Sequence, residues 1–163
     1  MRLAVHKNSS VREITSRDVL SIRHSILQFA ESAEASILSG DEDARALHFG
    51  FFVDTKLVGV ASLFVENISD RPGIGHRLRA MAVVSPMQRK GIGAALVKAA
   101  IDAAYIAKSD YLWCTVRKNA IGFYRKLGLQ EDEMEIVMAH GTFTRMILTF
   151  ELSKEMLWEA IRT

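Results

Sequence analysis

The chain has one cysteine, Cys114, and only two prolines among its 163 residues. A lone cysteine cannot close an internal disulfide, and it leaves no cysteine cluster to hold a metal ion. An excess of charge of one sign is also lacking: 21 basic and 19 acidic side chains leave a net charge of +2. This balance gives no electrostatic reason to expect a nucleic-acid partner.

Long hydrophobic runs are absent as well. The apolar stretch that follows Gly93 is interrupted by charged side chains, so it is not expected to span a bilayer. Residues 1–10 lack the apolar core of a signal peptide. We therefore expect a soluble, cytoplasmic protein without a membrane partner. The length predicts a single domain, residues 1–163, whose core needs no disulfide or metal.

The periodicity of the apolar residues predicts one mixed α/β sheet. Strands are expected at 11–14, 47–53, 57–65, 77–84, 111–116, 135–139 and 143–152. Helices are expected at 17–29, 31–38, 91–108, 120–127 and 153–163. Because a helix joins 77–84 to 111–116, these two strands should form a right-handed parallel crossover. The remaining strands should be mostly antiparallel.

The most informative segment is the tight turn between an apolar strand and the helix predicted at 91–108. The turn contains Gln88, Arg89, Lys90, Gly91, Ile92 and Gly93. Backbone N–H groups at the start of a helix have no intrahelical partner, and the helix dipole adds partial positive charge. Such a turn is suited to bind a phosphate group. Gly91 and Gly93 allow the anion to approach the backbone, and Arg89 and Lys90 add charge.

Other phosphate-binding loops fit this turn less well. A dinucleotide fingerprint needs a third glycine, where this chain has Leu96. A Walker loop needs Gly-Lys-Ser or Gly-Lys-Thr after the glycines, and neither is present. The alternative without a ligand is an ordinary strand-to-helix turn in which the glycines allow tight packing.

A second informative segment is 119–129. In its predicted short helix, Phe123 and Leu127 are four residues apart and are expected to face the core, with Tyr124 turned aside. Tyr124 is alternatively a core residue whose hydroxyl reaches a polar partner.

The two segments together resemble the two signatures of the GNAT N-acetyltransferase superfamily. The first is Gln-x-x-Gly-x-Gly after a strand, and the second is Phe-Tyr-x-x-x-Gly followed by an apolar residue. The resemblance is clear over 57–129 and loose elsewhere, although 140–146 is also similar to small bacterial members. The chain departs from the pattern at Leu129, which is usually aromatic, and at Asn119, which lies closer than usual to the Phe-Tyr pair.

This resemblance implies a GNAT-like fold, in which 77–84 and 111–116 form a splayed strand pair flanked by helices. It also implies acetyl-CoA as co-substrate, lying between these strands, and no metal. Met81, Ala82 and Val83 would pair with the pantetheine arm. The remaining cofactor-binding residues it implies are Gln88, Arg89, Lys90, Gly91, Ile92, Gly93, Ala94, Asn119, Phe123 and Tyr124.

The implied reaction is direct attack of a primary amine, on a small molecule or a peptide, on the thioester. The tyrosine matching Tyr124 protonates the leaving thiolate. The amine must lose a proton, and Glu66, at the end of the preceding strand, is the first candidate for the base. The alternative for Glu66 is a solvated carboxylate. His76, expected in a loop, is the second candidate base.

His48 and the acidic run 41–43 each have a structural interpretation beside a functional one. His48, at the start of an apolar strand, is expected to be structural rather than catalytic. The acidic run 41–43 either borders the acceptor pocket or is an ordinary solvated loop.

The competing functions are a non-catalytic acyl-CoA sensor and an interaction protein on the same fold. A homodimer is one oligomeric state that the sequence leaves open.

Overall fold

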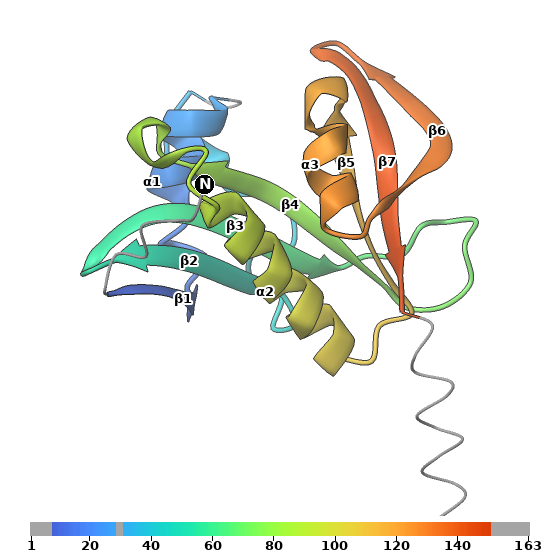
Figure 1. The fold of residues 1–163 in the computed structure, drawn as a ribbon, viewed down its shortest axis with the longest axis horizontal. Helices are drawn as coiled ribbons and strands as arrows, with labels where there is room; N and C mark the ends of the chain where they lie inside the picture. The colour runs from blue at the N-terminus through green and yellow to red at the C-terminus, as the bar shows by residue number, and fades with distance from the viewer. Residues whose placement is uncertain (1–7, 29–30, 151–163) are drawn as a thin grey trace, which may run out of the picture. The chain divides into compact units, whose positions relative to one another are not determined.

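The computed structural model describes residues 8–28 and 31–150. Its seven strands form one sheet in the order β1-β2-β3-β4-β5-β7-β6. The chain divides into two compact units, which we call unit 1 (residues 1–64 and 78–100) and unit 2 (residues 65–77 and 101–163). Strand β4 and helix α2, which are labelled in Figure 1, contribute residues to both units.

The elements have the following bounds. The strands are β1 (Ser9–Ile14), β2 (Leu47–Val53), β3 (Lys56–Val65), β4 (Gly75–Val83), β5 (Tyr111–Arg117), β6 (Gln130–Met138) and β7 (Gly141–Thr149). The α-helices are α1 (Leu20–Ile22), α2 (Ile92–Ile106) and α3 (Ile121–Lys126). The short π-helix is η1 (Arg23–Leu27), and the 3-10 turns are η2 (Glu34–Ser36), η3 (Ser85–Met87) and η4 (Lys118–Ala120).

Unit 1 is organised around strand β3, which is buried from Val58 to Phe64. Strands β1 and β2, and β2 and β3, pair in antiparallel fashion, as the sequence predicts. A Cβ atom at Gly59 would lie only 3.0 Å from Ile92 Cγ2 and 3.1 Å from Leu96 Cδ1. The missing side chain therefore allows the start of α2 to pack closely on β3.

Unit 2 contains the parallel pair predicted from the sequence. The start of β4 pairs with β5 from Gly75–Tyr111 to Arg77–Trp113. Strand β7 pairs with β5 along its length and forms a hairpin with β6. Helix α3 lies against β6 and β7, as Figure 1 shows. The mixed, mostly antiparallel sheet is thus confirmed.

The predictions for the first helices are partly wrong. Instead of a helix at 17–29, the structure has α1 followed by the π-helix η1, which ends at Gln28 with φ +51°. Instead of a helix at 31–38, only η2 forms. The Ser36 carbonyl and the Leu38 amide bond to side chains, those of Arg23 and Asp41, and are thus diverted from helical hydrogen bonds.

The prediction for β6 is also wrong at one end, since the strand begins at Gln130 and not at residue 135. Residues 131–133, near its start, are acidic, and acidic residues are uncommon in strands, so the sequence does not indicate a strand there. They are tolerated because β6 is an edge strand, where carboxylates remain hydrated or paired. The helix predicted at 153–163 lies outside the described residues. Within the described ranges, no helix is long and apolar enough to cross a membrane.

Candidate active site

The loop after β4 leads directly into α2 in unit 1. The Val84 amide donates to the Val58 carbonyl at 2.9 Å, which holds the end of β4 against β3. Gln88 then donates from its side-chain Nε2 to the Val83 carbonyl at 2.8 Å. The first residue of the predicted motif therefore ties the loop back to the strand.

Two residues of this loop have a left-handed backbone conformation just before α2 begins. Arg89 and Gly91 have φ of +60° and +81°, and glycine adopts this conformation at little cost. The Ala95 amide donates to the Gly91 carbonyl at 3.1 Å, so the amides from Gly91 to Ala94 precede the first helical hydrogen bond. The helix dipole adds partial positive charge there. The side chains of Arg89 and Lys90 are exposed.

The strand residues predicted to contact the pantetheine arm precede this loop. Met81 is half-buried, while Ala82 and Val83 are buried in β4. Ala80 has φ +53°, which is uncommon for a residue other than glycine. Nothing in the sequence marks Ala80. A left-handed residue inside a strand changes the direction of the following carbonyl and amide groups.

In unit 2, Tyr124 lies on α3 and its side chain is buried. Its ring contacts the ring of Phe123 edge-on, with centroids 4.9 Å apart. Burial raises the pKa of the Tyr124 hydroxyl above its ordinary value, and the neighbouring Cys114 adds to this rise. Burial also raises the pKa of the Cys114 thiol to about 12, against the opposing charge of Arg77. Tyr124 is therefore protonated at neutral pH, as a tyrosine of ordinary pKa also is.

The first prediction for the faces of α3 is wrong, whereas the alternative that Tyr124 is a core residue is confirmed by its burial. Phe123 and Leu127 are only half-buried, whereas Tyr124 is buried. The helix ends at Lys126, and the chain turns at Gly128 with φ +100°. This turn brings Leu129, rather than Leu127, into the core. Asn119 is exposed in the preceding turn η4.

Glu66 directly follows β3 and forms hydrogen bonds with two other residues of unit 2. Its Oε1 atom lies 2.8 Å from Arg77 Nη1, and its backbone carbonyl accepts a hydrogen bond from Trp113 Nε1 at 2.8 Å. The Arg77 guanidinium lies 4.4 Å from the centroid of the Trp113 ring. The Glu66 side chain is 38% exposed, so solvent reaches the carboxylate. Its role as a base stays a prediction.

A family model of the acetyltransferase (GNAT) domain matches residues 14–150. The chain belongs to the GNAT acetyltransferase family. It is 30% identical over 125 residues to the uncharacterized N-acetyltransferase YitI of Bacillus subtilis (strain 168), a match that covers 74% of this chain and 82% of that protein.

Solved structures of GNAT proteins and their relatives share the fold. A putative N-acetyltransferase from Lactobacillus plantarum matches with a TM-score of 0.71 and 14% identity, over 88% of this chain and 99% of that chain. FeeM, an N-acyl amino acid synthase from uncultured soil microbes, matches with a TM-score of 0.70 and 16% identity, over 87% of this chain and 91% of that chain. At such low identities, these likenesses show the fold alone.

The sequence predicts the structural role of His48 correctly and the location of His76 incorrectly. His76 is not a loop residue, because it lies inside β4 and is 6% exposed. The expectation that His76 lies in a loop is therefore wrong. His48 is buried in β2, as expected of a structural residue. Among residues 8–28 and 31–150, no group of three or more His, Cys, Asp or Glu side chains is arranged to hold a metal ion.

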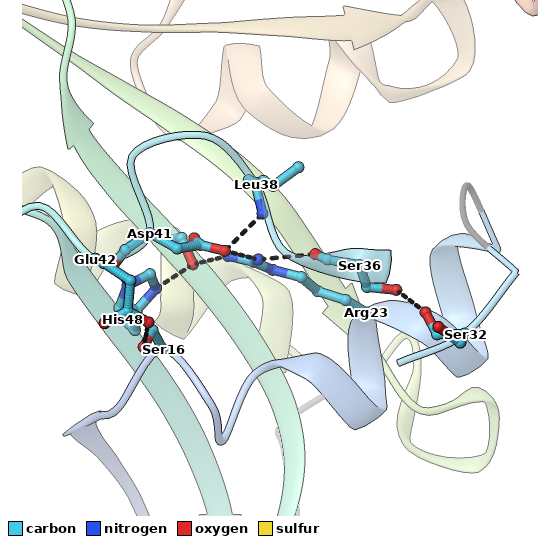
Figure 2. A network of polar contacts seen from close by, with 9 residues as sticks. Ser16, Arg23, Ser32, Ser36, Leu38, Asp41, Glu42 and His48 are labelled. Carbon is cyan, nitrogen blue, oxygen red and sulfur yellow. Dashed lines mark hydrogen bonds and ion pairs between the residues drawn. The ribbon is translucent and has the colours of Figure 1, made fainter. Parts of the chain in front are cut away.

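His48 belongs to a buried polar network in unit 1 that sequence reasoning missed (Figure 2). Arg23 donates to both carboxylate oxygens of Asp41, at 2.7 and 2.9 Å, and to Ser62 Oγ at 2.8 Å. The Asp41 carbonyl can only accept, so His48 Nε2 donates to it at 3.0 Å. In the neutral ring Nδ1 then accepts from the Ser62 hydroxyl at 2.7 Å.

The network corrects the prediction for the acidic run 41–43. Asp41 is 4% exposed, so it is neither solvated nor a wall of an open pocket. Burial alone would raise the pKa of its carboxyl, but hydrogen bonds from Arg23 and the Leu38 amide bring that pKa below its ordinary value. Only Glu42, which accepts from Ser16 Oγ, and Asp43, which pairs with Arg45, behave as surface carboxylates.

Proposed function

We propose that this GNAT chain catalyses acetyl-CoA-dependent N-acetylation of a primary amine on a small molecule or peptide. The observation that carries the proposal is the loop from Gln88 to Ala94. It combines backbone amides that precede the first helical hydrogen bond of a 15-residue helix with a positive φ at Gly91 and two exposed cationic side chains. This is a site for the pyrophosphate of a CoA ester.

The residues that would hold acetyl-CoA are those predicted from the sequence. The amides from Gly91 to Ala94 would bind pyrophosphate oxygens, with Arg89 and Lys90 adding charge. The backbone of Met81–Val83 would pair with the amides of the pantetheine arm. Gln88, Asn119, Phe123 and Tyr124 complete the predicted set. When bound, acetyl-CoA supplies an acetyl group as a thioester, whose carbonyl carbon is attacked by the amine nitrogen as the C–S bond breaks.

Two protons must move in this reaction, and the chain offers a group for each. Tyr124 would give its hydroxyl proton to the departing thiolate, because a tyrosine whose pKa is ordinary or raised is protonated at neutral pH. Glu66 would accept the proton of the amine, directly or through one water. Its half-exposed carboxylate is accessible to an incoming ammonium group, which it also attracts. Backbone amides near Met81 and Val83 would polarise the carbonyl.

The decisive experiment measures release of the free CoA thiol from acetyl-CoA while a panel of amines is added one at a time. The proposal expects that at least one amine raises thiol release above the amine-free rate. Gly91→Glu should abolish the effect, because a carboxylate would occupy the phosphate site. Acetyl-CoA binding without amine-dependent thiol release, across both small amines and peptides, would contradict the proposal and favour an acyl-CoA sensor.

A further inference from the structure

Three exposed apolar side chains of unit 2 lie at the end of α2 and on the loop beside it. Ile106 is 78% exposed and Tyr105 is 40% exposed. Ile74, directly before β4, is 52% exposed. Its carbonyl accepts hydrogen bonds from the Asp110 amide and from Ser109 Oγ, so this loop lies against the turn that follows α2. We call Ile74, Tyr105 and Ile106 the α2-end patch.

The chain leaves the sheet of unit 2 beside this patch. Strand β7 ends at Thr149, and the next residue, Phe150, donates from its amide to the Asp110 carbonyl at 3.0 Å. The rings of Phe150 and Tyr105 are in contact, with centroids 5.9 Å apart. Residues 151–163 follow in the sequence and lie outside the described residues. This segment is therefore joined to a residue that contacts the patch.

The sequence of 151–163 predicts a short amphipathic helix that Ser153 can cap. Apolar side chains recur at the spacing of one helical face, at Met156, Leu157, Ala160 and Ile161. The opposite face carries charged side chains, those of Glu155, Glu159 and Arg162. Isolated helices shorter than about 12–15 residues are marginal in water, so this helix needs an apolar surface on which to pack.

The other group of exposed apolar side chains in the described part of unit 2 lies on β6. Its most exposed members are Val137 and Met138, and Val137 pairs with Thr142 near the start of β7. From Thr142 to Phe150 the chain runs along β7, a span of about 26 Å at ~3.3 Å per residue. A helix over 153–163 is only about 16 Å long. Its apolar face therefore packs near Phe150 rather than at Val137.

We propose that the segment 151–163 forms a helix whose apolar face covers the α2-end patch of the same chain. This inference is independent of the proposed N-acetyltransferase function, and neither test below uses acetyl-CoA. Because the segment is joined to Phe150, its effective concentration at the patch is on the order of millimolar, which favours the same chain over a second copy. The contact removes the exposed side chain of Ile106 from water, together with the apolar face of the helix.

Disulfide cross-linking in the chain of 163 residues tests the contact directly. Ile106→Cys is combined with one further cysteine, placed in turn at each position from 155 to 162. A disulfide forms only where the two Cα atoms come within about 7 Å. Cys114, the one native cysteine, is buried and the pKa of its thiol is raised, so it reacts little.

We expect the yield of cross-linked monomer to follow the period of the helix. Leu157→Cys and Ala160→Cys, in the middle of the apolar face, should give high yields with Ile106→Cys. Glu155→Cys and Arg162→Cys, on the opposite face, should give yields lower by at least about fivefold. A monomer with an internal disulfide is distinguished from a disulfide-linked dimer by non-reducing gel electrophoresis.

Val137→Cys in place of Ile106→Cys is the matched control, because Val137 is 80% exposed and belongs to the same unit. It should give little internal cross-linking at any position of the segment. Equal yields from Ile106→Cys and Val137→Cys would overturn the inference, as would yields without helical periodicity. Cross-links only between chains would also overturn it, since the patch would then bind a second copy.

Thermal unfolding gives a second readout without added cysteines. Ile106→Asp and Leu157→Asp should each lower the melting temperature by roughly 3–8 °C, because each places a carboxylate in an apolar contact. The double variant should lose little more than either single variant, since the contact is already broken. The effects of Val137→Asp and Leu157→Asp should simply add. Additive effects of Ile106→Asp and Leu157→Asp, or no effect of either, would overturn the inference.

Discussion

Asp41→Asn should destabilise this protein far more than its position in an acidic loop indicates. Arg23 is fully buried, and its charge is neutralised by an Asp41 side chain that is 1% exposed. The aspartate oxygens accept three hydrogen bonds, two from Arg23 and one from the Leu38 amide. An asparagine has one acceptor oxygen and an NH2 group in place of the other. It therefore loses at least one of these bonds and leaves the arginine charge uncompensated.

The magnitude follows from the burial of the pair. Removing one partner of a buried ion pair costs about 3–5 kcal/mol, because the other charge remains desolvated. Most domains have a free energy of unfolding of only about 5–15 kcal/mol. At about 2–4 °C per kcal/mol for a chain of this size, Asp41→Asn should lower the melting temperature by roughly 6–20 °C. Urea denaturation followed by circular dichroism would measure the change in unfolding free energy.

Asp43→Asn is the matched control, because Asp43 lies two residues away and pairs with the exposed Arg45. It should leave the melting temperature essentially unchanged. The double replacement Arg23→Met with Asp41→Leu should cost less than Asp41→Asn alone, since no unpaired charge stays buried. Equal effects of Asp41→Asn and Asp43→Asn would refute the interpretation of the network.

The lowered pKa of Asp41 gives the same network a pH dependence. A carboxyl whose pKa is lower in the folded than in the unfolded state adds stability above its unfolded pKa, about 3.9. That stability is lost as the pH falls through the folded value. The wild-type protein should therefore lose unfolding free energy more steeply than Asp41→Asn as the pH falls below about 4.

Three further predictions concern the reaction and the strand that leads to the loop. Tyr124→Phe should lower kcat by about 10²–10⁴-fold with little change in acetyl-CoA affinity, and unchanged turnover would make Tyr124 a packing residue. Glu66→Gln should slow the reaction near neutral pH and recover partly at higher pH as free amine accumulates; a pH–rate profile identical to the wild type places the base elsewhere. Ala80→Gly should preserve or raise the melting temperature, because φ is +53° at this position and glycine adopts a positive φ easily. Ala82→Gly should lower the melting temperature, because it removes a buried methyl group. A lower melting temperature for Ala80→Gly than for Ala82→Gly would contradict the strained geometry of β4.

The parts of the molecule that the sequence predicts well are encoded locally. The loop from Gln88 to Gly93 can be recognised because a strand, a glycine turn and a helix start are contiguous in the sequence, and the structure has these elements in that order. The hairpin of β2 and β3, the parallel β4–β5 pair and α2 follow in the same way from runs of apolar residues. Such features need no knowledge of distant partners.

The parts that the sequence does not predict depend on distant contacts. Arg23 and Asp41 are 18 residues apart, and neither has a local pattern that marks it as buried. Their pairing nevertheless decides that 31–38 is not a helix, because it captures the Ser36 carbonyl and the Leu38 amide. A buried arginine can be found from sequence only when its partner is known.

Residue types also fail to predict the structure where a residue has a backbone conformation that is unusual for its type. Ala80 has a left-handed conformation although alanine gives no sign of it, so the irregularity of β4 appears only in the structure. The faces of α3 are misassigned for a related reason. A helix of six residues ends before the i, i+4 spacing from Phe123 to Leu127 is completed, so helical periodicity does not describe the burial.

Thermal unfolding with and without acetyl-CoA tests the central claim most directly, because a ligand that binds only the folded state raises the melting temperature. We predict a rise for the wild-type protein and for Gly122→Glu, whose new side chain would have open space around it on α3. We predict no rise, relative to its own ligand-free melting temperature, for Gly91→Glu, which places a carboxylate in the phosphate site. Arg89→Glu, an exposed charge reversal in the same loop, should reduce the rise. An unchanged melting temperature of the wild-type protein at millimolar acetyl-CoA, or an equal rise in Gly91→Glu, would contradict the account.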